Sequence, residues 1–345
     1  GISNMGVTFG YTANGVTNPG LVVKSGSLVN LDLTVNSSIS VGGVTFETTG
    51  LRFTYAQSTK TFTLGGSVSI SADGMNGMWA TFGYTNPDSS TVPGLTIVGG
   101  NLENLSLTVT SGFAVGGISF SVKNLNFTYQ NLSQIPGGSY SGAGVYTGTY
   151  SGTYDSSKYQ FNMSGTAYLT IGGMTDLSVT FGYSGPVNGG IKTNTNLIIV
   201  NGKLEAIDMT VTTGFTVGEV QFGVKDLELT YQNTSQIPNG ATRTTGVVFS
   251  GPYDTNKTYD ASKFEFCLSG TAYVTVGGIT GLSGTFGHTN KVTGAKTPGL
   301  ILIGYNVEAI SMTIDSNFMV GGVKFGTEDL QFIYQNMSQI PNGTN

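Results

Sequence analysis

The sequence has few charged residues: Asp, Glu, Lys and Arg make up 10% of its 345 residues, against roughly 25% in typical soluble domains. Its 14 Lys and Arg are spread thinly and the formal net charge is −5, so no basic stripe is present to neutralise phosphates. This argues against nucleic acid as a partner. The polar surface must then consist mostly of hydroxyl and amide groups, which suits close packing against further copies of the chain.

Groups that carry catalysis are scarce. Cys267 is the only cysteine, so no intrachain disulfide can form, and His288 is the only histidine. Cys267 has the strand parity opposite to Phe266 and Leu268 and has no histidine beside it in the sequence, so we predict a polar-face position rather than a nucleophile. We likewise predict a loop role for His288. No His, Cys, Asp or Glu cluster has metal-ligand spacing and no glycine-rich run matches a phosphate loop, so we predict no catalytic, metal or cofactor site and no enzyme activity.

Long apolar runs are missing as well. No stretch approaches the roughly 18 apolar residues of a membrane-spanning helix, and no signal peptide is visible. We therefore expect a mature or excerpted part of a secreted product, located outside the cell or at its surface, and do not expect a membrane as a partner.

What the sequence does contain is an internal repeat. Thr-Phe-Gly occurs four times, at Thr8–Gly10, Thr81–Gly83, Thr180–Gly182 and Thr285–Gly287. Each copy continues through a loop, a glycine turn, a Leu-x-Leu-Thr-Val-like segment, a Val-Gly-Gly-like turn and a Leu-x-Phe-Thr-Tyr-like segment. We define repeat 1 as residues 1–77, repeat 2 as 78–176 with an inserted loop at 130–158, repeat 3 as 177–281 with an inserted loop at 232–263, and repeat 4, which is incomplete, as 282–345. Serial copies of one unit are typical of arrays in which neighbours bury each other's apolar faces.

Within each repeat the apolar residues alternate. In repeat 1, Leu31, Leu33, Val35, Ile39 and Val41 share one parity, which predicts one strand over 31–41 with a buried and a solvated face. Gly42-Gly43 then predicts a two-residue hairpin turn, and the slip of parity near Gly50 predicts a bulge. The 53 glycines disfavour helix. We predict an all-β fold of four tandem antiparallel meander units, forming an elongated sandwich-like or curled sheet array, with a β-solenoid as the alternative.

Equivalent positions give specific expectations. We expect four core residues to be buried alike: Leu33, Leu107, Met209 and Met312. Three carboxylates that follow the tight turn are expected at solvated strand positions rather than as calcium ligands: Glu103, Glu205 and Glu308. Trp79 falls on the polar parity and is expected to be exposed, where it could make contacts or stack on sugar.

The motif Tyr-Gln-Asn-x-Ser-Gln-Ile-Pro occurs at Tyr129–Pro136, Tyr231–Pro238 and Tyr334–Pro341. Its Asn-x-Ser triplets are N-glycosylation sequons at the start of predicted exposed loops, which makes Asn131, Asn233 and Asn336 candidate glycosylation sites.

The function favoured by these features is a non-enzymatic structural subunit of an extracellular self-assembling filament, sheath, surface layer or adhesin stalk, whose main partner is another copy of itself. Open sheet edges would allow strand addition between chains. One alternative is a porin-like outer-membrane β-barrel, because four repeats of about four strands give a porin-like number. A second alternative is a carbohydrate-binding surface protein with cell-surface glycans as partners, which would need a row of exposed aromatic residues that Trp79 alone does not supply.

Overall fold

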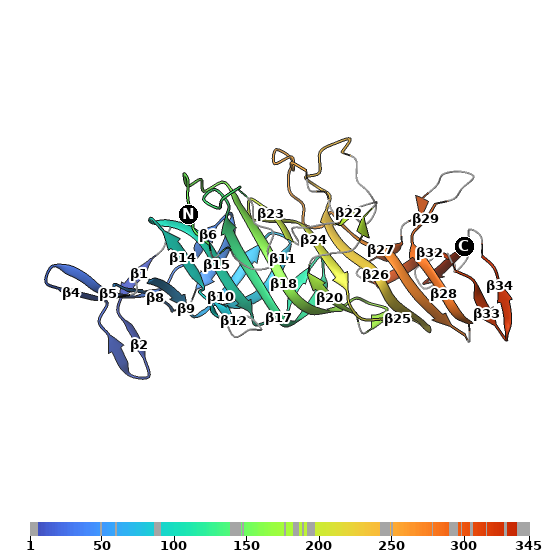
Figure 1. Cartoon of the computed structure of the whole chain (residues 1–345), viewed down its shortest axis with the longest axis horizontal. Helices are drawn as coiled ribbons and strands as arrows, with labels where there is room; N and C mark the ends of the chain where they lie inside the picture. Colours follow the sequence, from blue (N-terminus) through green and yellow to red (C-terminus); the bar gives the residue numbers. More distant parts are fainter. Residues whose placement is uncertain are drawn as a thin grey trace. The chain divides into compact units, whose positions relative to one another are not determined.

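The prediction of an all-β protein is confirmed. A computed structural model describes residues 6–48, 50–58, 61–85, 91–138, 146, 148–175, 177–181, 186–187, 190–191, 197–241, 249, 251–277, 279–289, 296–297, 299–303, 306–314, 316–327 and 330–336. Within these ranges there are strands, turns and loops but no helix (Figure 1). The pairs of neighbouring strands in register are antiparallel, as the two-residue turns require.

The first strands along the chain are β1 (Val7–Phe9), β2 (Tyr11–Ala13), β3 (Val16–Asn18), β4 (Leu21–Lys24), β5 (Ser27–Val35), β6 (Ile39–Val41), β7 (Val44–Thr48), β8 (Leu51–Ala56), β9 (Thr61–Gly65) and β10 (Ser67–Ala72). They are followed by β11 (Met75–Phe82), β12 (Tyr84–Thr85), β13 (Thr91–Val92), β14 (Leu95–Val98), β15 (Asn101–Val109), β16 (Phe113–Val115), β17 (Ile118–Asn131) and β18 (Tyr159–Thr170).

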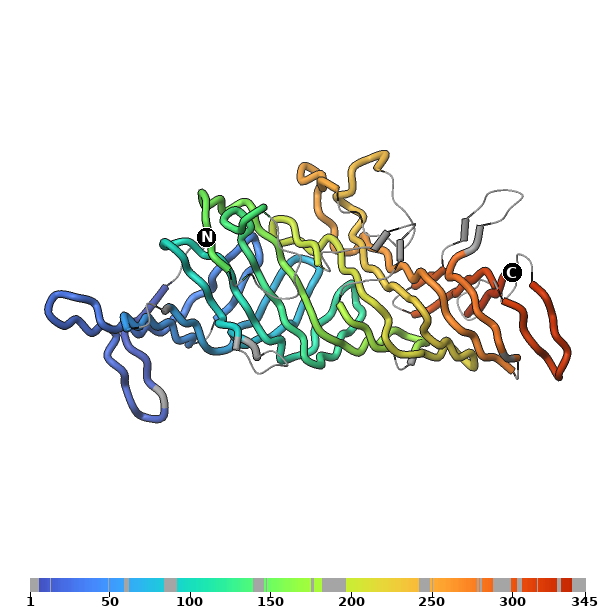
Figure 2. Tube along the Cα trace, in the orientation of Figure 1, coloured from blue at the N-terminus to red at the C-terminus, as the bar shows by residue number. Residues whose placement is uncertain are grey.

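The second half of the chain forms β19 (Met174–Thr175), β20 (Ser178–Phe181), β21 (Pro186–Val187), β22 (Gly190–Ile191), β23 (Leu197–Val200), β24 (Lys203–Val211), β25 (Phe215–Val217), β26 (Val220–Asn233) and β27 (Phe264–Val276). The last strands are β28 (Ile279–Phe286), β29 (His288–Thr289), β30 (Lys296–Thr297), β31 (Leu300–Ile303), β32 (Asn306–Ile314), β33 (Phe318–Val320), β34 (Val323–Phe325) and β35 (Leu330–Gln335). Figure 2 traces the backbone through these hairpins.

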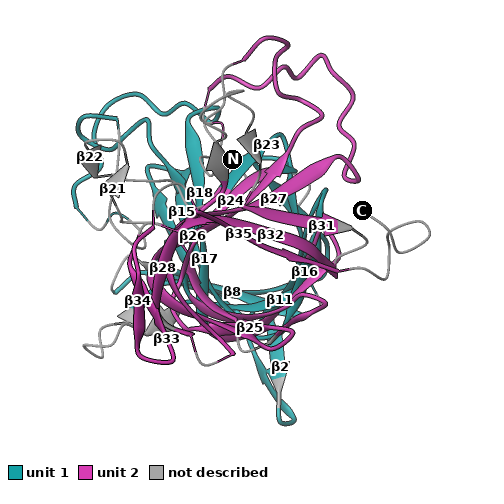
Figure 3. Cartoon of the chain, turned by 90° about the vertical axis from the view of Figure 1, so that its right-hand side faces the viewer, with its two compact units in different colours: residues 1–114, 124–165, 198–204 teal, residues 115–123, 166–197, 205–345 magenta. Residues whose placement is uncertain are grey.

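The chain divides into two compact units, coloured teal and magenta in Figure 3. Unit 1 comprises residues 1–114, 124–165 and 198–204, and unit 2 comprises residues 115–123, 166–197 and 205–345. In unit 1, one sheet has the order β1-β5-β8-β9 with β4 also on β5, and a second path runs β7-β10-β11-β15-β17. In unit 2 the path is β18-β20-β24-β26-β27-β28-β32-β35.

One pairing recurs in the four repeats. The strand that follows the tight turn pairs with the Leu-x-Phe-Thr-Tyr-like strand, and the register is the same each time: Leu33↔Phe53, Leu107↔Phe127, Met209↔Leu229 and Met312↔Phe332. All four of the predicted core residues in these pairs are buried. The period-two alternation therefore located the core face correctly.

The Thr-Phe-Gly motif is explained by a backbone contact. The N–H of Gly10 donates to Asp32 O at 2.8 Å, and Asp32 N–H donates to Gly20 O at 2.9 Å. Gly10 has φ +93°, and a Cβ added to Gly20 would lie 2.4 Å from Gly10 N. Both glycines are thus required where two backbones touch. The same pair of bonds recurs in repeats 2 and 4 through Gly83, Ser106 and Gly94, and through Gly287, Ser311 and Gly299.

The prediction of one continuous strand over residues 31–41 is wrong. The chain forms β5 and β6 separately, because β5 pairs with β8 whereas β6 pairs with β7. Thr48 Oγ1 donates to Ser37 O at 2.8 Å within the intervening residues. The predicted hairpin turn is confirmed, because Gly42 and Gly43 close the β6–β7 turn with φ +57° and +82°. Near Gly50, which has φ +65°, one strand ends and another begins instead of the predicted bulge: β7 pairs with β6 and β10, whereas β8 pairs with β5 and β9.

Neighbouring repeats meet at these turns. In unit 1, a Cβ on Gly42 would lie 2.7 Å from the Tyr159 ring, and one on Gly43 would lie 2.4 Å from the backbone of Asn201 and Gly202. In unit 2, a Cβ on Gly116 would lie 3.0 Å from the Phe264 ring. The turn of one repeat is therefore covered by the next repeats, and the glycines are what permit this approach.

Candidate functional site

The single cysteine and the single histidine lie on different strands. Cys267 is half-buried on β27, opposite Thr230, while its neighbours Phe266 and Leu268 are buried, as the parity predicted. His288 belongs to β29 and pairs with Thr297, but its side chain lies outside the described part of the structure. Within the described ranges, no three His, Cys, Asp or Glu residues are close enough to hold a metal ion. Trp79 is exposed, as expected.

The prediction for the recurring carboxylates is wrong. Glu103, Glu205 and Glu308 are buried rather than solvated. Both carboxylate oxygens of Glu103 are buried without a hydrogen-bond partner among the described residues. This burial raises the pKa of the Glu103 carboxyl above its usual range, because removal from water penalises the charged form.

What covers Glu103 is the inserted loop of repeat 2. Tyr150 Oη accepts hydrogen bonds at 3.2 Å from Gln130 Nε2 and Asn104 Nδ2, and donates to Tyr146 O at 2.7 Å. Gln130 Nε2 also donates to Glu103 O at 3.1 Å, and its Oε1 accepts from Tyr146 N–H at 2.6 Å. The loop thus closes over the strand that carries the carboxylate. Many of the described residues of the insertion are exposed, as predicted, but Tyr146, Tyr150 and Tyr154 are half-buried.

Repeat 3 builds the same arrangement. Gln232 Nε2 donates to Glu205 O at 3.0 Å and to Tyr253 Oη at 3.3 Å, while Gln232 Oε1 accepts from Phe249 N–H at 2.7 Å. Tyr253 Oη in turn donates to Phe249 O. Burial raises the pKa of Tyr231 below this loop to about 12, so its hydroxyl stays protonated at neutral pH. In repeats 2 and 3, the glutamine at the same position of the motif therefore fastens the inserted loop.

The remaining polar residues of the Tyr-Gln-Asn-x-Ser-Gln motif serve the same purpose. Asn131 Nδ2 donates to Asp155 O at 2.8 Å, and its Oδ1 accepts from Ser133 N–H at 2.9 Å and from the Ser133 hydroxyl. Gln134 Nε2 donates to Gly152 O at 2.8 Å. The equivalent bonds of Asn233 reach Asp260 and Ser235. The motif is an anchor for the loop backbone.

This geometry corrects the expectation that the sequon asparagines are exposed. Asn131 and Asn233 are buried, and their Nδ2 atoms already donate hydrogen bonds. A glycan on either nitrogen would require the loop to open, and the Asn-x-Ser spacing is accounted for by the Asx turn it forms. Asn336 is half-buried, and the following residues of its triplet lie outside the described ranges.

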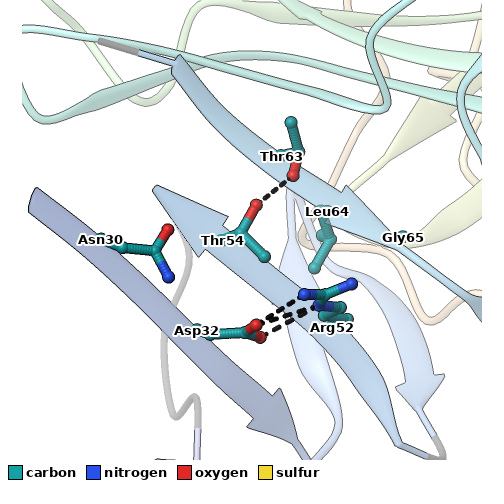
Figure 4. Close-up of a pocket in the computed structure, with 7 residues that line it drawn as sticks. All are labelled: Asn30, Asp32, Arg52, Thr54, Thr63, Leu64 and Gly65. Carbon is teal, nitrogen blue, oxygen red and sulfur yellow. Dashed lines mark hydrogen bonds and ion pairs between the residues drawn. The ribbon is translucent and has the colours of Figure 1, made fainter. Parts of the chain in front are cut away.

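A polar pocket on repeat 1 holds an ion pair (Figure 4). Arg52 Nη2 lies 2.6 Å from Asp32 Oδ2 and Nε lies 3.0 Å from Oδ1, and the guanidinium also sits 4.9 Å from the centre of the Tyr11 ring. The hydrogen bond to Asp32 raises the pKa of Arg52. Thr54 and Thr63 bond to each other across the pocket. The cation is therefore already neutralised, so the pocket offers no unpaired charge to a ligand.

The most distinctive surface lies in repeat 4. Val320, Val323, Phe325 and Leu330 are exposed, with fractions of 39%, 57%, 45% and 42%. Their equivalents in repeats 1 to 3 are at most 8% exposed: Val41, Val115 and Val217; Val44, Ile118 and Val220; Phe46, Phe120 and Phe222; Leu51, Leu125 and Leu227. The four exposed residues are hereafter the C-terminal apolar patch.

Repeat 1 also exposes apolar residues that are more deeply buried in the other repeats. Phe9, Leu21 and Val23 are exposed, and Leu21 is 52% exposed while its equivalents Leu95, Leu197 and Leu300 are at most 3% exposed. In the later repeats the preceding strand lies against this region: a Cβ on Gly94 would lie 3.0 Å from Leu64 O of β9, and one on Gly299 would lie 2.5 Å from Leu268 O of β27. Phe9, Leu21 and Val23 are hereafter the N-terminal apolar patch.

Comparison with known proteins adds no assignment, since no family model, curated protein or solved structure matches the chain. No helix in the described ranges is long and apolar enough to cross a bilayer.

Proposed function

We propose that this chain is a non-enzymatic structural subunit that associates with copies of itself, in an extracellular filament, sheath, surface layer or adhesin stalk. The observation that carries the proposal is the pair of apolar patches. The equivalents of all four residues of the C-terminal apolar patch, and those of Leu21, are buried in the other repeats, and the equivalents of Phe9 and Val23 are buried or half-buried. Each patch therefore has the composition of a repeat-to-repeat contact. Contiguous exposed apolar residues of this kind are typical of protein interaction sites.

The low charge of the chain supports the same function. With 10% charged residues, few like charges oppose the approach of a second copy. A stable contact needs to bury on the order of 1,000 Å² in total. Residues from β33, β34 and β35 jointly present the C-terminal apolar patch, which provides a broad surface rather than one isolated side chain.

The test is the size of the purified chain as a function of concentration. We expect light scattering to show species larger than the 35.9 kDa monomer, and electron microscopy to show ordered assemblies. Phe325→Asp places a charge in the C-terminal apolar patch and should shift the population to monomer. Tyr273→Asp is the matched control, because Tyr273 is 51% exposed on β27 but lies outside both patches, and it should assemble like the unmodified chain.

Two results would contradict the proposal. One is a monodisperse 35.9 kDa species at every concentration. The other is equal assembly of the Phe325→Asp and unmodified chains, which would place the contact elsewhere.

A further inference from the structure

Strand β35 is paired on one side only in the described part of the chain. It pairs with β32, in the register Ile310↔Tyr334 and Met312↔Phe332. Its equivalents in repeats 1 and 3 are paired on both sides: β8 lies between β5 and β9, and β26 lies between β24 and β27. Exposure agrees with this difference, because Leu330 and Ile333 of β35 are 42% and 57% exposed whereas their equivalents Leu227 and Thr230 of β26 are buried.

The backbone of β35 directs hydrogen-bonding groups to its open side. Next to the strand, Asn336 N–H donates to Glu308 O on β32 at 2.7 Å. N–H directions alternate along a strand, so the N–H of Ile333, three residues earlier, points away from β32. A row of such groups is a template for the addition of a further strand.

The strands that occupy this position elsewhere share a side-chain pattern. In β27, Phe264, Phe266 and Leu268 alternate with polar residues, and the two aromatic rings lie 5.7 and 5.3 Å from the ring of Tyr231. In β18 the corresponding residues are Tyr159, Phe161 and Met163, and the first two rings lie 5.6 and 5.5 Å from Tyr129.

In repeat 4 the equivalent ring is Tyr334, which is half-buried. It corresponds to Tyr129 and Tyr231, which are both fully buried beneath their covering strands. Aromatic pairs at such distances stabilise their contact beyond the area they bury. Tyr334 and the C-terminal apolar patch therefore present the side-chain half of the surface, and the open edge of β35 presents the main-chain half.

We propose that the edge of β34 and β35 is a binding site for an extended segment of a partner polypeptide, whose first three inward residues are aromatic, aromatic and aliphatic in alternate positions. The segment adds as an antiparallel strand, pairs with the backbone of β35 as β27 pairs with β26, and covers Tyr334 and the C-terminal apolar patch. This inference rests on the proposed function in one respect only: self-association is the biological use that the binding site on β34 and β35 would serve.

The probe for the test is a fluorescent peptide with the sequence of β18, Tyr159–Thr170, which contains no cysteine. Its binding to the full chain is measured by fluorescence anisotropy, at protein concentrations where light scattering detects only monomer. We expect saturable binding, and at least a tenfold loss of affinity for the peptide that carries both Tyr159→Ser and Phe161→Ser. This comparison leaves the protein unchanged, so it does not depend on the folding of a variant.

A pair of protein variants tests the position of the site. Ile333→Pro removes the N–H that points to the open edge and leaves the pairing with β32 in place, so it should weaken peptide binding at least tenfold. Ile333→Thr keeps that N–H and introduces the residue found at the equivalent positions 54, 128 and 230, so its affinity should stay within about twofold of the unmodified chain.

Absence of saturable binding, or binding that neither the serine peptide nor Ile333→Pro weakens, would overturn the inference. If the chain self-assembles but does not bind the peptide, a second copy covers the C-terminal apolar patch without adding such a strand. The proposed function then stands while this inference fails. If the peptide binds as expected to a chain that stays monomeric at every concentration, the inference stands and the proposed function fails.

Discussion

Repeats 3 and 4 contain the same aromatic pair in two different environments. In repeat 3, Phe215 and Phe222 stack at 5.0 Å, and Phe222 is 1% exposed. In repeat 4, Phe318 and Phe325 stack at 5.3 Å, yet Phe325 is 45% exposed. The hairpin and its ring stacking are therefore local properties of the sequence. Burial is supplied by the neighbouring repeat, because Phe222 also meets Phe286 and Phe332.

The largest expected difference between the two environments is in core truncation. Phe222→Ala should lower the free energy of unfolding by roughly 3–5 kcal/mol, because it removes a fully buried ring and leaves a cavity. Phe325→Ala removes a half-exposed ring and should cost less than about 1.5 kcal/mol. Chemical denaturation of both variants would measure this. Equal losses would show that Phe325 is covered in solution.

Two turn glycines offer a second matched pair. Gly43 and Gly322 have almost the same φ, +82° and +83°, but a Cβ on Gly43 would lie 2.4 Å from the Asn201 and Gly202 backbone, whereas nothing lies within 4 Å of one on Gly322. Gly322→Ala should cost about 1–2 kcal/mol for its φ alone. Gly43→Ala should cost roughly 2–4 kcal/mol, because crowding of the backbone adds to that strain.

The same denaturation experiment checks these values. A Gly43→Ala variant no less stable than Gly322→Ala would mean that the contact between the Gly43 turn and the backbone of Asn201 and Gly202 opens without cost.

The anchored loop can be tested at Asn131. Asn131→Ala removes the acceptor for Ser133 and the donor to Asp155, and leaves part-buried backbone groups unpaired, so we expect a loss of about 1–3 kcal/mol. Asn76→Ala is the control, because Asn76 is exposed on β11. Limited proteolysis should cut the Asn131→Ala loop faster than that of the control. Identical rates would show that the Asx turn does not hold the loop.

The smallest effect, with the opposite sign, is expected at Glu103. The pKa of Glu103 is raised in the folded chain. As pH rises above the usual pKa of Glu, the unfolded chain therefore loses its proton first. The free energy of unfolding falls as a result, until pH has passed the pKa of the folded chain. Below that range both states are protonated and the residue carries no such cost. Glu103→Gln should therefore stabilise the chain by about 1 kcal/mol at pH 7 and much less at pH 4.

Glu47→Gln serves as the control, since Glu47 is exposed on β7. A pH-independent difference between Glu103→Gln and the unmodified chain would contradict the effect of burial.

Side-chain parity was sufficient to predict much of the fold. It placed Leu33 and Met312 in the core, and the glycine pairs predicted the hairpin turns. It failed at the break between β5 and β6, because both segments keep the same apolar parity while they pair with different strands. A pattern within one strand carries no information about which partner the strand will take.

The burial of the carboxylates was missed because their charge was given more weight than their parity. Glu103 shares the odd-numbered parity of the buried Leu105 and Leu107, and its cover comes from Tyr150, which lies in an insertion without periodicity. A further signal was available: Gln130 and Gln232 recur with Asn and Ser in fixed spacing, at the start of each insertion. Three hydrogen-bonding residues repeated in this way indicate a common structural task, and here that task is to anchor a loop.

The turn contacts at Gly42 and Gly116 have a consequence for how such a chain can change over generations. The covered turns of repeats 1 and 2 meet aromatic residues at corresponding positions of the following repeat, Tyr159 and Phe264. A duplicated or deleted copy of the unit would therefore restore the same contact without any new side chain. Gene recombination between copies could lengthen or shorten the protein while each junction stays compatible, so the number of units is free to vary under selection.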